Sequence, residues 1–300
     1  MPHNCGHHHS CHLSKKALIM AIAINGVLTI AQIIGGVAAN SLALLTDALH
    51  NASDALALVL ALVAIIIGER PADDKRSFGY KRAESIAALI NLTALIMLGL
   101  YLAGKSIHNL FVPEDVHAPI MIWVALVALI IDTGTALLLR THAHSSENMR
   151  AAFLHNVMDA LASLAVIIGG LAIFYKGWNW IDPALSLIIS LYVIAHGYQA
   201  MKNTIHLLMQ GTPHHIDTAA LEQTMRAHDY VIDIHHIHVW QLHEHRTALE
   251  AHVVISDIRQ MESVKQSLKA LLHEKFHISH STLEFEDTEV SENCKKHSHN

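Results

Sequence analysis

Six long runs of mostly apolar residues constrain the fold of this 300-residue chain more than any other feature. A helix of about 20 mostly apolar residues spans the hydrocarbon core of a bilayer, so each run predicts one transmembrane helix. Only 15% of the residues are charged, against about 25% in a typical soluble domain. The sequence therefore predicts an all-α six-helix transmembrane bundle over residues 15–210. The runs lie near 17–39, 42–68, 84–104, 118–139, 150–175 and 182–205.

Lysine and arginine gather on one side of the predicted membrane. They precede the first run and fill the loop after the second, whereas the opposite side holds little besides Lys105 and Lys176. The positive-inside rule then places both termini in the cytoplasm. The first run has no small-residue cleavage site behind it, so we expect a retained helix and not a signal peptide. Without an organelle address, we expect a multi-pass protein of a bacterial plasma (inner) membrane, surrounded by lipid.

The composition changes after Gly211-Thr212-Pro213, which supplies a stop for the last long helix. The order of predicted elements beyond it is αββαβ, which is typical of a ferredoxin-like α+β domain. We expect this soluble domain over 211–288 and a polar tail over 289–300. Its helices are predicted at 217–228 and 260–275, and its strands at 231–243, 246–256 and 281–286.

Ionisable side chains interrupt the apolar runs, although each costs roughly 2.5–3.5 kcal/mol or more inside a bilayer. Spacings of three, four and seven place the three in the second run on one helical face, and the two in the fifth run lie one turn apart. Such residues are functional hypotheses by default. They are Asp47, His50 and Asp54 in the second run, Asp132 in the fourth, and His155 and Asp159 in the fifth.

Two His-x-x-x-Asp pairs on different helices offer two imidazoles and two carboxylates, the number and type of ligands in a tetrahedral Zn²⁺ site. The midpoint of each pair lies within about 5.4 Å, one helical turn, of its helix centre, so the pairs can meet near the midplane. The sequence favours a metal site made by His50, Asp54, His155 and Asp159.

Other interpretations of these residues stay open. The pairs can hold helices together by hydrogen bonds, or bind a purely structural zinc. Asp47 either belongs to the same water-filled face or caps the outer end of its helix. Asp132 either pairs with a polar side chain or lines a proton path, and the partners considered are Asn25, Gln32 and Asn91.

The soluble domain holds a second group among the 27 histidines of the chain. Strand alternation predicts that His236 and His238 share one face while His235 takes the other, and His252 on the next strand can approach either. Solvated surface histidines are the alternative.

Four segments resemble motifs of the cation diffusion facilitator family, and the resemblance extends from about residue 15 to 287. They are SLALLTDALHNASD (41–54), RPADDKRSFGYKRAES (70–85), HNVMDALAS (155–163) and DIHHIHVW (233–240). The resemblance implies a homodimer that exchanges cytoplasmic Zn²⁺ for protons by alternating access. The implied transport ligands are His50, Asp54, His155 and Asp159. Histidine at position 50 is the family variant associated with zinc, and with cadmium next.

The resemblance also implies a regulatory zinc site at the dimer contact, formed by His235, His252 and Glu284, with Glu286 as a further candidate. Glu284 stands where some relatives have histidine. In the loop 70–82 some relatives bind an additional metal through histidines, but this chain has Arg76 and Tyr80 there. We expect no tight metal in that loop, because the remaining carboxylates of Asp73 and Asp74 are poor ligands for a transition metal.

Both tails have the composition of flexible metal-collecting segments. A purification tag is the alternative for the three consecutive histidines. All three cysteines lie in these tails, which argues against a disulfide-stapled core. The residues are Cys5, His7, His8, His9, Cys11 and His12 at one end and Cys294, His297 and His299 at the other.

Several function classes are disfavoured. A formal net charge of −6 without a basic face argues against a nucleic-acid partner. A membrane metallohydrolase needs an open coordination position and a separate base, but the carboxylates of the apolar runs are already ligands in the transport model. The sequence also has no GxSxG nucleophile elbow. Protons compete with metal for histidine and carboxylate ligands, so the transport site predicts a proton-coupled antiporter. The alternative is a membrane-anchored metal sensor that signals through its soluble domain.

Overall fold

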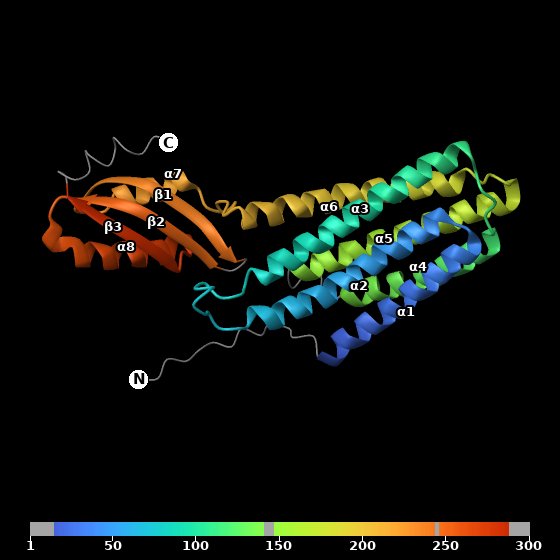
Figure 1. The fold of residues 1–300 in the computed structure, drawn as a ribbon, viewed down its shortest axis with the longest axis horizontal. Coiled ribbons are helices and arrows are strands. Elements are labelled where there is room, and N and C mark those ends of the chain that lie inside the picture. The colour runs from blue at the N-terminus through green and yellow to red at the C-terminus, as the bar shows by residue number, and fades with distance from the viewer. Residues whose placement is uncertain (1–14, 141–146, 244–245, 288–300) are drawn as a thin grey trace. The chain divides into compact units, whose positions relative to one another are not determined.

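The structure, a computed structural model of the whole chain, describes residues 15–140, 147–243 and 246–287 (Figure 1). The two predicted metal-collecting tails, residues 1–14 and 289–300, lie outside the described residues. The described residues divide between two compact units, Met1–Leu62 with Ile90–Gln199 and Val63–Leu89 with Ala200–Asn300.

The predicted six-helix transmembrane architecture is confirmed. The helices α2 to α6 are each long and apolar enough to cross a membrane, and within the residues searched α1 contributes the shorter apolar segment Gly26–Ala39. The chain is therefore a multi-pass integral membrane protein. The helices are α1 (Lys15–Ala39), α2 (Leu42–Gly68), α3 (Ala83–Phe111), α4 (Ala118–Arg140), α5 (Glu147–Lys176) and α6 (Ile181–Leu208).

The interior of the bundle is built from small residues, which let helix backbones approach closely in a membrane. Ala43, Ala118 and Ala125 are at most 4% exposed and belong to this core. At Gly35 of α1 an added Cβ atom would lie only 2.5 Å from Val124 of α4. The close approach of α1 and α4 therefore requires glycine at position 35.

The start of α2 is held by a carboxylate from another helix. Asp182, in the first turn of α6, accepts hydrogen bonds from the Ser41 hydroxyl at 2.5 Å and from the Leu42 amide at 2.7 Å. The Ala43 amide donates to the same carboxylate at 3.3 Å. Asp182 is 2% exposed, so these bonds satisfy amides that would otherwise be left without partners at a buried helix end. The cap ties α2 to α6 eight residues before His50.

A chain of hydroxyl groups continues this link inside the bundle. Thr46 of α2 and Ser186 of α6 lie 2.7 Å apart, and Ser106 of α3 donates to Ser186 at 2.8 Å. Ser106 lies beyond the apolar run that predicted the third helix, yet it is fully buried. Polar residues thus extend α3 to Phe111, past the predicted end at 104.

The soluble unit has the predicted αββαβ order. Its elements are α7 (Thr218–Arg226), β1 (Val231–His243), β2 (Arg246–Ile255), a short 3-10 helix (Ile258–Gln260), α8 (Met261–Phe276) and β3 (His280–Asp287). The central strand β2 pairs antiparallel with β1 and parallel with β3. Fully buried side chains from both helices, Leu221 and Met225 on α7 and Leu268 and Leu272 on α8, pack with the strands in one core. The α+β fold class is confirmed.

Candidate metal sites

The helices α2 and α5 bring two histidines and two aspartates together. His155 Nε2 lies 3.1 Å from Asp54 Oδ2 and 3.4 Å from Asp159 Oδ2. His50 Nε2 lies 3.7 Å from a carboxylate oxygen of each aspartate. One ligand atom from each of His50, His155 and Asp159 falls within 4.8 Å of the other two, and Asp54 reaches both histidines. We name these four residues the helical quartet.

The quartet has a buried half and a partly exposed half. The side chains of His50 and Asp159 are 11% and 12% exposed, whereas those of Asp54 and His155 are 36% and 41% exposed. The two imidazole rings meet edge to face with centroids 5.7 Å apart. The Nε2 atom of each histidine faces carboxylate oxygens of both aspartates.

Asp47 is linked to α1. It is 2% exposed and accepts a hydrogen bond from Gln32 Nε2 at 2.7 Å, while Gln32 Oε1 accepts one from Asn51 at 3.0 Å. The structure therefore places Asp47 in a helix-to-helix contact, beside the quartet in sequence but outside its group of converging atoms.

Asp132 of α4 accepts a hydrogen bond from Ser163 of α5 at 3.3 Å. Ser163 was not among the partners expected from the sequence. Gln32, one of those expected, bonds to Asp47 and Asn51, and the side chain of Asn25 lies outside the described residues.

A second cluster lies on the three-stranded sheet. His252 Nδ1 and Glu286 Oε1 are 2.6 Å apart, and His235 Nε2 lies 3.5 Å from Glu286 Oε2. Glu284 reaches His252 Nε2 at 3.5 Å but is 68% exposed. His235, His252 and Glu286 each offer one ligand atom within 4.8 Å of the others. We name His235, His252, Glu284 and Glu286 the sheet cluster.

The predicted alternation of histidines along β1 is wrong. His235 pairs with His252 and His238 pairs with Glu250, so β1 has one more residue than β2 between these two pairs. This is a β-bulge, and within it His236 has a φ of 51°. The bulge brings the His236 ring within 5.1 Å of His252 and 5.4 Å of His235. His236 therefore lies against the sheet cluster. Alternation could not reveal this, because a bulge shifts the period by one residue.

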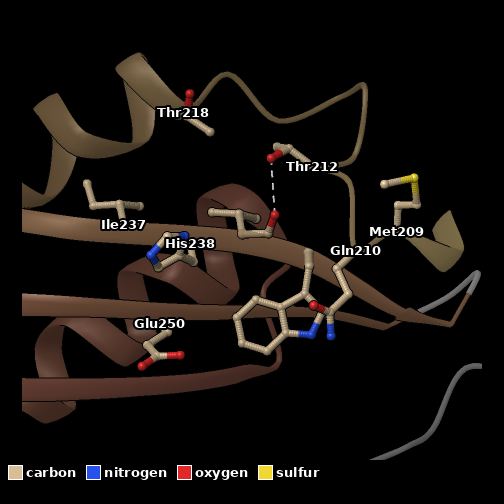
Figure 2. A pocket seen from close by; sticks show the side chains of 9 residues that line it. Met209, Gln210, Thr212, Thr218, Ile237, His238 and Glu250 are labelled. Atoms are coloured by element: carbon tan, nitrogen blue, oxygen red, sulfur yellow. Dashed lines mark hydrogen bonds between the residues drawn. The ribbon is translucent and has the colours of Figure 1, made fainter. Parts of the chain in front are cut away.

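His238 lies away from the sheet cluster and lines a separate pocket of about 470 Å³ (Figure 2). It stands opposite Glu250 in the strand register, and Trp240 lines the same pocket. The Thr212 hydroxyl closes one side of the pocket by donating to the Val239 carbonyl at 3.1 Å (Figure 2).

The loop after α2 is organised around Asp73. Its carboxylate accepts hydrogen bonds from the Tyr80 hydroxyl at 2.5 Å and from the amides of Arg76 and Lys75 at 2.7 and 2.9 Å. The Arg76 guanidinium stands 4.8 Å above the Tyr80 ring. The Tyr80 hydroxyl is the main reason why the pKa of Asp73 lies below its ordinary value. Protein donors from Lys75, Arg76 and Tyr80 thus occupy the Asp73 carboxylate.

Comparison with known proteins covers nearly the whole chain. Residues 18–209 match the cation efflux transmembrane domain and residues 213–288 the cation efflux protein cytoplasmic domain. A Bacillus subtilis protein named a cadmium, cobalt and zinc/H(+)-K(+) antiporter is 35% identical over 94% of this chain and 92% of its own length. The zinc transporter ZitB of Escherichia coli is 30% identical over 97% of each chain.

Among solved structures, the metal-bound C-terminal domain of the CzcD transporter from Cupriavidus metallidurans is 33% identical over 24% of this chain and 99% of its own, with a TM-score of 0.23. The two domain matches and the 35% identity over nearly the full length show that this chain belongs to the cation efflux family, the cation diffusion facilitators, which are secondary membrane transporters and not enzymes.

Proposed function

We propose that this protein exports divalent transition metal ions from the cytoplasm in exchange for protons, with zinc as the favoured cargo and cadmium next. The ion binds the helical quartet. The observation that carries this proposal is the convergence of His50, Asp54, His155 and Asp159 from two helices, with nitrogen-to-oxygen distances of 3.1 to 3.7 Å.

These distances fit a tetrahedral zinc site. Zinc bonds to histidine and carboxylate are about 2.0–2.2 Å long, so neighbouring ligand atoms in a tetrahedron lie roughly 3.3–3.5 Å apart. The four contacts bracket that spacing without the ion. The charges also match, because one Zn²⁺ neutralises two carboxylates that would be costly to leave ionised in a membrane. Imidazole with carboxylate suits zinc better than it suits the harder ions Mg²⁺ or Ca²⁺.

The same ligands account for proton exchange. Histidine and aspartate hold a metal only when deprotonated, so protons that reach the quartet compete with zinc and promote its release. His155 and Asp54 are the partly exposed members, and we propose that protons and metal enter through them. The relatives named as zinc transporter and as cadmium, cobalt and zinc antiporter support this choice of cargo.

We further propose a homodimer in a bacterial plasma membrane with both termini in the cytoplasm. The family that matches residues 213–288 is named for dimerisation of zinc transporters. The sheet cluster, His235, His252, Glu284 and Glu286, is proposed as a regulatory zinc site in that cytoplasmic domain.

Zinc flux into proteoliposomes with an imposed pH gradient tests the proposal. The wild type is measured beside Asp159→Ala and His50→Ala, with His196→Ala as the matched control, because His196 is a histidine of α6 outside the quartet. We expect flux that follows the gradient, disappears in both quartet variants and persists in the control. Zinc binding by the wild type without flux, or normal flux in the quartet variants, would contradict the proposal.

The membrane-anchored sensor is separated from the transporter by deleting residues 211–300. A transporter keeps part of its flux without the cytoplasmic domain, because the quartet lies in α2 and α5. A sensor loses all function.

A further inference from the structure

The two ring nitrogens of His50 have different surroundings. Nε2 faces the carboxylates of Asp54 and Asp159, each at 3.7 Å. Nδ1, on the other side of the ring, is buried and has no hydrogen-bond partner among the residues that the structure describes. A buried polar atom without a partner is costly and calls for an explanation.

A small cavity adjoins His50. It is lined by α2, α3 and α6, and its only polar side chains belong to Thr46, His50 and Ser190. About 10 Å³ of it is open to the centre of a water molecule, which is close to the 10–15 Å³ that one water needs. Ser190 is fully buried, and its hydroxyl also has no partner within the described part of the chain.

The neighbouring hydroxyl groups are already engaged. Thr46 donates to the Leu42 carbonyl at 2.8 Å, and Ser186 contacts both Thr46 and Ser106. Ser190 lies one helical turn beyond Ser186 on α6 and is the hydroxyl with bonding capacity left beside His50. Two residues that each carry an unpaired buried polar atom therefore line one cavity that has room for a single water.

We propose that one water occupies this cavity and bridges Ser190 Oγ to His50 Nδ1. The water accepts a hydrogen bond from the Nδ1–H group and so holds His50 in the tautomer whose Nε2 lone pair points at the metal. A ligating histidine is commonly fixed through its other nitrogen in this way. Ser190 is thus a positioning residue for the helical quartet, and this role rests on the proposed transport function.

Ser190→Ala tests the role. Loss of a partner that orients a ligating histidine costs 10–100-fold in metal affinity, so we expect the KM for zinc in proteoliposomes to rise about 10–100-fold, while kcat changes far less. Ser186→Ala is the matched control, because it removes a buried hydroxyl group from the same helix, but one that contacts Thr46 and not His50. The control is expected to lower thermal stability. Its KM should stay within about twofold of the wild-type value, because the lost hydroxyl group takes no part in substrate binding.

A double-mutant cycle separates positioning from packing. His50→Asp keeps a metal ligand but has no second ring nitrogen to orient. If Ser190 acts through His50 Nδ1, Ser190→Ala changes KM little in the His50→Asp background. An equal rise in KM in both backgrounds, or an unchanged KM for Ser190→Ala alone, overturns the proposal.

A measurement without transport completes the test. In the zinc-loaded protein Nε2 binds the metal and the ring proton is on Nδ1, so the ¹H and ¹⁵N shifts of the His50 Nδ1–H group report its hydrogen bond. We expect a hydrogen-bonded Nδ1–H signal in the wild type and an upfield shift of its ¹H signal in Ser190→Ala. An Nδ1–H signal that is the same in both proteins overturns the water bridge whether or not the protein moves zinc, whereas absent zinc flux with the expected signals overturns only the transport function.

Discussion

His155 Nε2 lies 3.1 Å from Asp54 Oδ2, although the two residues are 101 positions apart and belong to different helices. His50 and Asp159 form the opposite cross-helix contact at 3.7 Å. Each histidine of the quartet therefore faces the carboxylate of the other helix as well as that of its own. An ion bound here, as we propose, would join α2 to α5, and its release would leave two histidines and two carboxylates to share protons.

The unequal exposure of the two aspartates predicts unequal losses. Asp159 is 12% exposed and Asp54 is 36% exposed. Removing one partner of a buried charged contact costs about 3–5 kcal/mol, on the order of 10²–10⁴-fold, whereas exposed contacts contribute about 0–1 kcal/mol. We expect Asp159→Asn to weaken zinc affinity by on the order of 10²-fold or more and Asp54→Asn to weaken it clearly less. Zinc titration of both purified variants measures this, and equal losses would contradict the division into a buried and a partly exposed half.

The Asp182 cap predicts a stability effect far from the metal ligands. Asp182→Ala leaves the amides of Leu42 and Ala43 and the Ser41 hydroxyl without their acceptor. Each buried group that loses its partner costs about 1–3 kcal/mol, so we expect unfolding in detergent at a clearly lower temperature. Asp182→Asn keeps one acceptor oxygen and is expected to lose roughly half as much. A melting temperature equal to wild type in Asp182→Ala would show that the cap contributes nothing.

The secondary structure was predictable because two periodicities are strong in this chain. Each apolar run is long enough to span the membrane once and so predicts one helix. In the cytoplasmic domain, strand alternation and helix signals predict the αββαβ order. The predicted helix ends are wrong where polar residues extend a helix. In α3, for example, Ser106 is accommodated by a hydrogen bond to Ser186. A partner 80 positions away is not visible to a local pattern.

The candidate sites were predictable only where each helix carries its own signal. The His-x-x-x-Asp spacing places two ligands on one face of α2 and of α5, and the cost of charge in a membrane makes both pairs conspicuous. The cap of Asp182, the contact of Asp132 with Ser163 and the cavity beside His50 depend on helix packing, which spacing does not encode. His236 was misplaced because one bulge reverses the alternation of β1.

The sheet cluster predicts which histidine matters most for zinc binding in the cytoplasmic domain. His252 contacts Glu286 at 2.6 Å and Glu284 at 3.5 Å, so its removal breaks both contacts. The test uses the double variant His50→Ala, Asp159→Ala, in which the helical quartet is disabled. In this background we expect His252→Ala to lower the affinity of the remaining zinc site. Loss of a residue that only orients a ligand costs about 10–100-fold in affinity, so loss of a ligand should cost at least as much. His238→Ala is the matched control, because His238 lies on the same strand as His235 but lines another pocket. An equal loss in both variants would argue against a site at this cluster.

The loop after α2 predicts a pH effect that is independent of metal. The Tyr80 hydroxyl is the largest cause of the lowered pKa of Asp73, and the backbone amides of Arg76 and Lys75 contribute less. We therefore expect Tyr80→Phe to raise the pKa of Asp73 toward its ordinary value, which a ¹³C NMR titration of the carboxyl group measures.

A carboxyl group whose pKa is lowered by folding stabilises the fold above its unfolded pKa, and this contribution is lost as the pH falls through the folded value. The stability difference between wild type and Tyr80→Phe should then be largest near neutral pH and vanish in acid. Tyr230→Phe is the control, since Tyr230 belongs to the loop before β1, and an Asp73 that titrates at the same pH in all three proteins would remove Tyr80 as the cause.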